Sequence, residues 1–348
     1  MNKVIQWSLI ILSLIYVNGL QAKSLVYIDE NLDGFAKVDE NTKITFPKDH
    51  GAHPKFRTEW WYITANLKDS NGKLFGVQWT LFRTALSPKD SNDSWGNNQI
   101  WMGHAALTTS RFHFFSEKFA RGGVGQAGVK ISPFKAWIDD WSFIGDWENG
   151  MLKASGDHFS YNLALSSTKP IVFHGKNGVS QKSFEGAKSH YYSQPFFKIE
   201  GSVELNGETH EVSGEAWADR EWSSQIISET QIGWNWLGLH LDDESKIMIF
   251  EVKGKNGISF FSGTRIYQDG SSKILKTQDF ILKPLSPSSY KNKDIQLEWE
   301  ITIPSEEVAI KIFPINQNAY MDTFIPYWEG PVMVEGTHAG KGYLEVTM

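Results

Sequence analysis

Residues 58–83 read TEWWYITANLKDSNGKLFGVQWTLFR, and this stretch decides the fold. Two runs rich in aromatic and β-branched residues, 58–67 and 74–83, flank a polar segment that contains Asn71-Gly72. Asn-Gly between two such runs is a strong signal for a β-hairpin, because both residues tolerate the positive φ angles of a tight turn. The odd-numbered residues from Phe75 to Leu81 are all apolar, as expected for one face of a strand.

The rest of the chain repeats this pattern of short strands separated by turn residues. No segment sustains a helical period, and a short helix within 320–327 is the one exception we expect. Many short strands with turns between them indicate a sandwich or a barrel. We predict strands at residues 100–108, 135–138, 141–147, 151–155, 159–165, 196–205, 209–217, 232–241, 246–253, 258–267, 272–279, 295–303, 308–313, 332–335 and 342–347.

The chain also contains a weak internal repeat. WWY at residues 60–62 precedes a turn and an apolar strand, and WNW at residues 234–236 does so at the same spacing. EGSV at residues 200–203 is echoed by EGPV at residues 329–332. Two related β-barrels in tandem explain these echoes better than one long sheet, with the boundary near residues 218–230.

The first 22 residues are typical of a secretory signal peptide. Lys3 is followed by the apolar-rich run Val4–Val17, and small and polar residues then lead to Ala22. A run of 14 residues is short for crossing a bilayer, which takes roughly 20. We therefore expect an exported protein, periplasmic or secreted, with residues 1–22 removed; the alternative is an uncleaved membrane anchor.

The composition narrows the function classes. The absence of cysteine excludes disulfides and thiolate metal sites, and the net charge of −6 gives no basic surface for nucleic acid. There is no Gly-x-Ser-x-Gly and no His-Glu-x-x-His motif, so neither an α/β-hydrolase nor a zincin is indicated. The 15 Trp, 22 Phe and 11 Tyr suit β-sheet cores, with some left over to line a pocket for an apolar ligand.

No cofactor is expected. Residues 123–128, GVGQAG, formally fit the dinucleotide-binding pattern, which should open a helix. The residues that follow, VKISP, read instead as a strand and a break. We interpret this segment as a loop, and the chain as having neither a cofactor nor a metal site.

Residues 214–223, GEAWADREWS, carry the most suggestive chemistry. If this segment is extended, alternation places Trp217, Asp219 and Glu221 on one face and Arg220 on the other. The apolar surface of Trp217 and the like charge of Glu221 would then raise the pKa of Asp219. A protonated carboxyl group of this kind can donate a proton to an alkene or a carbonyl, while aromatic faces stabilise the developing cation. The alternative is a structural network in which Glu59, Glu221, Arg57 and Arg220 pair beneath the barrel ends.

Three stretches make the chain resemble the AttH/carotenoid 1,2-hydratase (CrtC)-like superfamily, in its secreted "predicted hydrolase" branch. They are EWWY at 59–62, GEAWADREWS at 214–223, and YWEGPV at 327–332 with GYLE at 342–345. The resemblance spans nearly all of the chain after the signal segment. It implies an all-β protein of two tandem lipocalin-like β-barrel domains, 23–222 and 223–348, with a hydrophobic ligand site near their junction.

The resemblance also implies site residues. In the hydratases an Asp two residues after an aromatic residue is the proton donor, which matches Trp217 and Asp219. An upstream His and an aromatic residue two positions later line the same pocket, which matches His190 and Tyr192. The motif here, WADREW at 217–222, departs from the hydratases, so the fold carries over more safely than the reaction.

Our first hypothesis is a hydratase- or hydrolase-type enzyme for a lipid- or isoprenoid-like molecule. Asp219 is the predicted general acid, and His190 positions water or relays its proton. The predicted substrate-binding residues are Tyr192, Trp217, Trp61, Glu59 and Glu221. The main alternative is a non-catalytic lipid carrier or chaperone partnered with an ABC transporter, as the gene context of the family suggests. Carbohydrate binding on Trp platforms is a third, weaker hypothesis.

Overall fold

The computed structural model describes residues 32–89, 97–225, 231–290 and 293–347. Within these residues the chain forms two large antiparallel sheets and one small two-stranded sheet. The helical elements of this part are the short 3-10 turns η2 (Lys48–His50), η3 (Thr277–Asp279) and η4 (Pro304–Glu306). The all-β prediction is thus confirmed. The short helix expected within 320–327 is wrong, because Tyr320–Met321 pairs as a strand instead.

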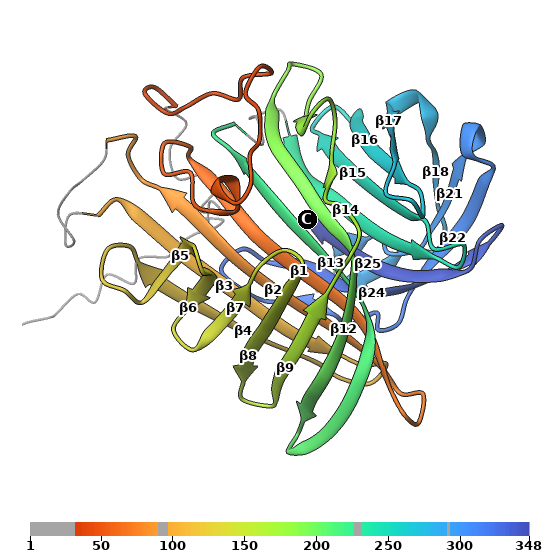
Figure 1. Cartoon of the computed structure of the whole chain (residues 1–348). Helices are drawn as coiled ribbons and strands as arrows, with labels where there is room; N and C mark the ends of the chain where they lie inside the picture. The colour runs from red at the N-terminus through yellow and green to blue at the C-terminus, as the bar shows by residue number, and fades with distance from the viewer. Residues whose placement is uncertain (1–31, 90–96, 226–230, 291–292, 348) are drawn as a thin grey trace, which may run out of the picture.

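The first sheet curls around its own core and follows the order β4-β3-β2-β1-β13-β12-β9-β8-β7-β6-β5, with β10 and β11 paired to β12. In Figure 1 it runs from the orange strands to the green ones. Its strands are β1 (Thr58–Asp69), β2 (Leu74–Ala85), β3 (Gln99–Thr108), β4 (His113–Arg121), β5 (Ala127–Ile131), β6 (Phe134–Ile138), β7 (Trp141–Gly145), β8 (Asn149–Gly156), β9 (Phe159–Ser166), β10 (Val172–Phe173), β11 (Val179–Gln181), β12 (Lys188–Leu205) and β13 (Glu208–Ser223).

The second sheet follows the order β17-β16-β15-β14-β25-β24-β22-β21-β18, with β23 paired to β24. It begins at Gln231, after the first sheet has ended at Ser223. The separate pair is β19 (Ser288–Tyr290) with β20 (Lys293–Ile295). The strands of the second sheet are β14 (Gln231–Leu241), β15 (Lys246–Gly254), β16 (Ser259–Ile266), β17 (Ser272–Lys276), β18 (Ile281–Pro284), β21 (Trp299–Ile303), β22 (Val308–Pro314), β23 (Tyr320–Met321), β24 (Tyr327–Gly336) and β25 (Gly340–Thr347).

The two large sheets share one strand order around their central strands. β1 lies between β2 and β13, and β14 lies between β15 and β25 in the same way. WWY at 60–62 is on β1 and WNW at 234–236 is on β14, so this part of the sequence repeat marks equivalent strands. Figure 1 shows β1, β13, β14 and β25 near the centre of the molecule, where the two sheets lie against each other.

The central strands are buried on both faces, and alternation divides their side chains between two cores. On β1, Trp61 and Ile63 belong to the interior of the first sheet, whereas Trp60 and Tyr62 belong to an aromatic cluster between the sheets. On β14, Leu237 points into the second interior. The junction is therefore a third core, made from the outward faces of both curled sheets.

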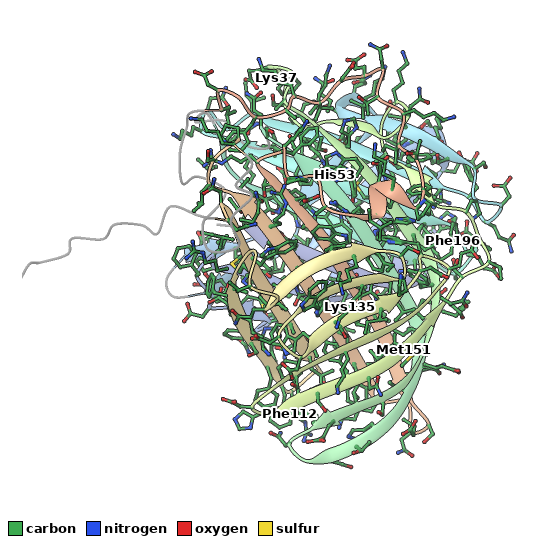
Figure 2. The ribbon with its side chains drawn as sticks, turned by 60° about the vertical axis from the view of Figure 1, so that its left-hand side comes forward. Lys37, His53, Phe112, Lys135, Met151 and Phe196 are labelled. Carbon is green, nitrogen blue, oxygen red and sulfur yellow. The ribbon has the colours of Figure 1, made fainter. Side chains whose placement is uncertain are left out.

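The segment before β1 lies against the first sheet. Residues 32–57 place His50 next to Tyr192, with His50 Nδ1 2.7 Å from the Tyr192 hydroxyl. His53, labelled in Figure 2, stacks on Trp222 at 4.0 Å. The predicted signal peptide, residues 1–22, lies outside the described residues. In the described part of the chain, no helix has the length and apolar character needed to span a membrane.

Candidate functional site

A small, partly open cavity lies in the junction between the two sheets. Its volume is about 80 Å³. Aromatic side chains form most of its surface, and three carboxyl groups line it. The lining residues are Thr58, Trp60, Tyr62, Thr80 and Phe82 from β1 and β2, Asp219 and Glu221 from β13, and Trp234, Trp236, Phe250 and Glu345 from the second sheet.

Of the three cavity acids, Asp219 accepts the most side-chain hydrogen bonds from described residues. It sits on β13, directly opposite Tyr62 of β1, and is 3% exposed. The indole of Trp217 donates to its Oδ1 at 2.5 Å, and the Ser193 hydroxyl donates to the same oxygen. The Tyr191 hydroxyl donates to Oδ2 at 2.7 Å. Segment 214–223 is thus extended, and Trp217, Asp219 and Glu221 share a face as predicted.

Burial raises the pKa of Asp219 from 3.8 to about 7. The three hydrogen bonds act in the opposite direction, because they stabilise the carboxylate, and the nearby charge of Glu221 adds to the rise. Desolvation is the largest of these effects. Asp219 therefore holds its proton over much of the range in which an ordinary aspartic acid is fully ionised.

The donors to Asp219 are themselves fixed by a second layer of buried groups. His174 Nε2 lies 2.6 Å from the Ser193 hydroxyl, and His174 Nδ1 lies 2.8 Å from the hydroxyl of Thr264 on β16. Burial pushes the pKa of His174 well below its usual value, so the ring is neutral. The indole of Trp236 donates to the Tyr191 hydroxyl at 3.0 Å. Both sheets therefore contribute to the orientation of one carboxyl group.

The second acid of β13, Glu221, lies in a buried ion pair. Lys182 Nζ lies 2.8 Å from Glu221 Oε1, and both side chains are buried. The ammonium group also lies 4.6 Å from the ring centre of Tyr191 and 4.2 Å from that of Phe250. Glu221 is thus a charged neighbour of Asp219 whose own charge is balanced by Lys182.

The third acid of the cavity, Glu345, comes from the second sheet. It lies opposite Trp236 of β14, and the indole of Trp234 donates to its Oε1 at 2.6 Å. Its pKa is raised from 4.5 to about 7, mainly by burial; the Trp234 hydrogen bond acts against the rise, and the carboxyl groups of Asp219 and Glu221 add to it. The cavity therefore contains two carboxyl groups, Asp219 and Glu345, that titrate near neutral pH.

The structure does not bring His190 and Tyr192 to this cavity, which corrects the predicted grouping. Ser193 pairs with Asp219 and Tyr191 with Glu221, so His190 and Tyr192 project from the opposite face of β12. Tyr192 belongs to the core inside the first sheet. His190 is packed against Trp222 and Phe56, and burial lowers its pKa to about 4. Because side chains alternate between the two faces of a strand, the register of β12 against β13 decides which of its residues meet the acid.

Trp61 and Glu59 also lie on that inner face, away from the cavity. Glu59 forms buried ion pairs with Arg83 and Arg220, which hold its pKa well below the usual value. The Arg220 guanidinium lies over the ring of Trp61, 3.9 Å from its centre. The structural network predicted as the alternative thus exists for Glu59 and Arg220, with Arg83 as the further partner, whereas Glu221 pairs with Lys182.

Several residues that line the cavity or hold Asp219 were not predicted from the sequence. Tyr62 and Trp60 alternate with Trp61 on β1, and Tyr191 alternates with His190 on β12. Once the registers of β1 and β12 against β13 are known, parity from Asp219 selects Tyr62, Tyr191 and Ser193, but the sequence does not give those registers. Glu345 was harder to predict, because only the internal repeat relates its strand in the second sheet to the strand of Asp219.

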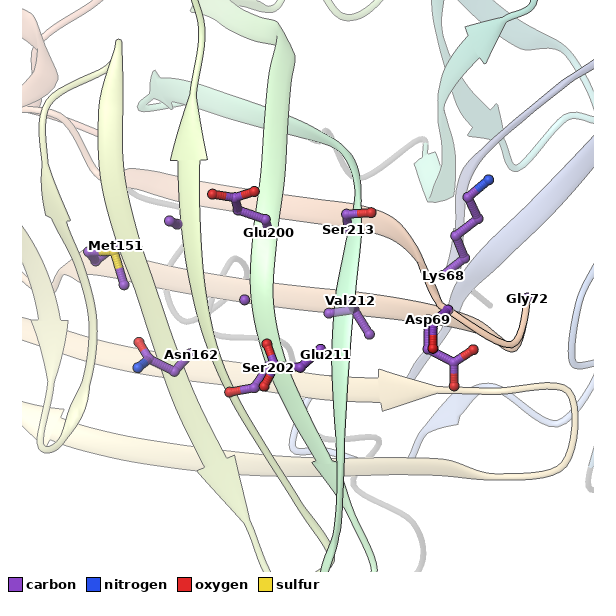
Figure 3. Close-up of a pocket in the computed structure, with 13 residues that line it drawn as sticks. Lys68, Asp69, Gly72, Met151, Asn162, Glu200, Ser202, Glu211, Val212 and Ser213 are labelled. Carbon is purple, nitrogen blue, oxygen red and sulfur yellow. The ribbon is translucent and has the colours of Figure 1, made fainter.

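A larger hollow of about 870 Å³ lies elsewhere, on the outside of the first sheet. Figure 3 shows it between the loop after β1 and the strands β9, β12 and β13, with Lys68, Asp69, Glu200 and Glu211 around it. It is open and bordered by charged side chains, and none of its lining residues is aromatic. It therefore lacks the features that suit a hydrophobic ligand.

The fold and the junction cavity define a protein of two lipocalin-like β-barrels with an aromatic, acid-containing cavity between them. The chain belongs to the AttH-like family, whose model matches residues 37–348. A candidate AttH from Nitrosomonas europaea is similar to it, with 29% identity, a TM-score of 0.79, and coverage of 90% of this chain and 99% of that one. No curated protein sequence matches the chain.

Two further solved structures share the fold at lower identity. Kievitone hydratase from Nectria haematococca is 14% identical, with a TM-score of 0.67 and coverage of 90% of this chain and 96% of that one. CghA, solved with Sch210972, is 10% identical, with a TM-score of 0.58 and coverage of 93% and 97%. At these identities the likeness concerns the fold, and the chemistry of this chain has to be argued from its own residues.

Proposed function

We propose that this protein binds a hydrophobic small molecule in the junction cavity and adds water to a carbon–carbon double bond of that molecule. Asp219 is the proposed proton donor. The observation that carries the proposal is a buried carboxyl group that remains protonated to about pH 7 on the wall of an aromatic cavity. A general acid is most effective when its pKa lies near the working pH.

The hydrogen bonds of Asp219 indicate which oxygen carries the transferable proton. The indole N–H of Trp217 is a donor only, so Oδ1 is fixed as an acceptor. The Tyr191 hydroxyl at Oδ2 can rotate and accept a hydrogen bond instead of donating one. We therefore place the proton of neutral Asp219 on Oδ2, and its transfer to the alkene leaves a carboxylate that the three donors stabilise.

The cavity surface suits the cation that this transfer creates. Protonation of an alkene leaves positive charge on the neighbouring carbon, and the faces of tyrosine and tryptophan rings attract such charge. Tyr62 and Trp236 meet edge to face at 5.1 Å beside Asp219. Attack of water on the cation and loss of one proton from that water then complete the hydration.

The size of the cavity sets a condition on binding. About 80 Å³ accommodates a few water molecules, at roughly 30 Å³ each, and no lipid-sized ligand. The half-buried side chains of Trp60, Phe82 and Trp234 lie on the side nearest solvent. A ligand larger than a few atoms must displace these rings, so we propose that the cavity opens by their movement.

Further support comes from relatives. One protein with this fold is named a hydratase, and the chain resembles the carotenoid 1,2-hydratase superfamily in the motif that includes Asp219. We also propose that the protein is exported, on the strength of the apolar run Val4–Val17. The work of such an enzyme would then take place outside the cytoplasm, without disulfides to stabilise it.

Isotope labelling tests the reaction without knowledge of the product. The protein is incubated with a panel of isoprenoid and prenylated aromatic alkenes in H₂¹⁸O, and mass spectrometry follows the gain of one labelled water. Asp219→Asn should abolish the gain while its circular dichroism spectrum stays that of the parent and its thermal unfolding occurs at no lower temperature. Glu211→Gln, an exposed acid on the same strand, is the matched control and should retain full activity.

Two results would reject the proposal. Undiminished labelling by Asp219→Asn would remove Asp219 as the donor. Native mass spectrometry that finds a stoichiometric lipid bound and chemically unchanged, together with no labelling of any alkene, would favour the carrier that works with an ABC transporter.

A further inference from the structure

The junction cavity contains a second acid in a position equivalent to that of Asp219. Asp219 lies on the strand beside β1, opposite Tyr62, and Glu345 lies on the strand beside β14, opposite Trp236. Because β1 and β14 are the equivalent central strands of the two sheets, the two acids enter the same cavity from opposite sheets. Each accepts a hydrogen bond from a tryptophan indole.

The two acids differ in how firmly they are held. Counting the described residues, Asp219 accepts side-chain hydrogen bonds from Trp217, Ser193 and Tyr191, whereas Glu345 accepts one from Trp234. That bond goes to Oε1 of Glu345, which leaves Oε2 for a water or a ligand. Glu345 is also half-buried rather than buried, because it borders the cavity.

Ionisation of Asp219 opposes that of Glu345, because both carboxyl groups line one cavity and the Asp219 charge raises the pKa of Glu345. Glu221 is neutralised by Lys182, and burial together with the Glu345 charge keeps Glu329, opposite Glu345 on β24, protonated. Two carboxyl groups in one desolvated site resist ionising together, since the first charge opposes the second. Three phenols with raised pKa values, Tyr62, Tyr191 and Tyr327, also face this region.

We propose that Glu345 is the general base of this site and accepts the proton that the attacking water releases. The inference rests on the proposed hydration and assigns its second half. Asp219 gives its proton to one alkene carbon, a water oxygen bonds to the other, and that water passes a proton to Glu345. The proton then returns from Glu345 to Asp219 through the water in the cavity, so that alkene and water are consumed and an alcohol is formed.

The first experiment measures the coupling without any substrate. Carbon-13 labelling of the Asp and Glu side-chain carboxyl groups lets NMR follow both acids from pH 4 to 9. Asp219→Asn should lower the pKa of Glu345 by about one unit, because it removes the opposing charge, and Glu345→Gln should lower that of Asp219 equally. Glu335→Gln, an exposed acid on β24, is the control and should shift neither. If the titration curve of each acid is unchanged when the other acid is substituted, the coupling between Asp219 and Glu345 is overturned.

The second experiment separates this inference from the proposed function. In the ¹⁸O assay Glu345→Gln should slow labelling about 100-fold or more, as loss of a general base does, and its residual rate should no longer fall below pH 7. A merely structural role would lower the rate without removing that acidic limb. If Asp219→Asn is inactive while Glu345→Gln keeps the parental rate and pH profile, the base is refuted and the hydration stands. If Asp219→Asn stays active, the proposed donor itself fails.

Discussion

Asp219→Asn should stabilise the protein at alkaline pH. The native state holds the Asp219 proton up to about pH 7, whereas the unfolded chain releases it near pH 3.8, so raising the pH between these values favours unfolding. Each pKa unit corresponds to about 1.4 kcal/mol, and the rise of about three units therefore costs the native state about 4 kcal/mol above pH 7. Asparagine keeps an acceptor for Trp217 and has no proton to lose.

Urea unfolding of both proteins at pH 4, 6 and 8 measures this effect. The free energy of unfolding of Asp219→Asn, minus that of the parent, should grow by about 4 kcal/mol from pH 4 to pH 8. Glu59→Gln supplies a control of opposite sign, since Arg83 and Arg220 lower the pKa of Glu59 and removing its charge leaves both guanidinium groups buried without it. The free energy of unfolding of Glu59→Gln should be about 3–5 kcal/mol lower than that of the parent at pH 8. If the difference in free energy of unfolding between Asp219→Asn and the parent does not change with pH, Asp219 is not a buried acid that stays protonated in the native state.

Two more substitutions probe the surroundings of Asp219. Trp217→Phe removes a donor to the carboxylate, so the pKa of Asp219 should rise above 7 by about one unit. Infrared titration should show this as a higher pH midpoint for the loss of the protonated carboxyl band. An unchanged midpoint would mean that the indole does not donate in solution. Lys182→Met leaves Glu221 buried without its partner and should lower the free energy of unfolding in urea by about 3 kcal/mol. The double variant, which also carries Glu221→Gln, should recover most of that loss. Equal losses in the single and double variants would show that the ion pair is not the cause.

Much of the fold could be predicted because its local signals agree. The hairpin of β1 and β2 follows from Asn71-Gly72 and from alternation in the flanking runs, and the structure pairs these strands over their whole length. The curl of each sheet was not predictable from these signals, since it depends on contacts between strands far apart in the chain. The segment 320–327 was misread for the same reason, because pairing with Trp328 and Tyr327 makes its first residues a strand.

The site could be predicted only in part. Alternation placed Trp217 and Glu221 beside Asp219, because that argument needs one strand alone. The partners from β12 were assigned by their spacing in a motif, and spacing does not fix the parity of a strand against its neighbour. Pairing of Ser193 with Asp219 turns His190 and Tyr192 to the other face. The cavity residues of the second sheet depend on how the two sheets pack against each other, and no local sequence pattern predicts that packing.

The two faces of the central strands explain why one motif carries both stability and proposed chemistry. Along β13, Arg220 points inward and is neutralised by Glu59, while Asp219 points outward into the junction and lies away from that positive charge. If both side chains shared a face, the guanidinium would lower the pKa of Asp219 and leave it ionised, as it does for Glu59. A protonated acid at neutral pH therefore requires the second sheet, because only its packing turns the outer face of β13 into a desolvated surface.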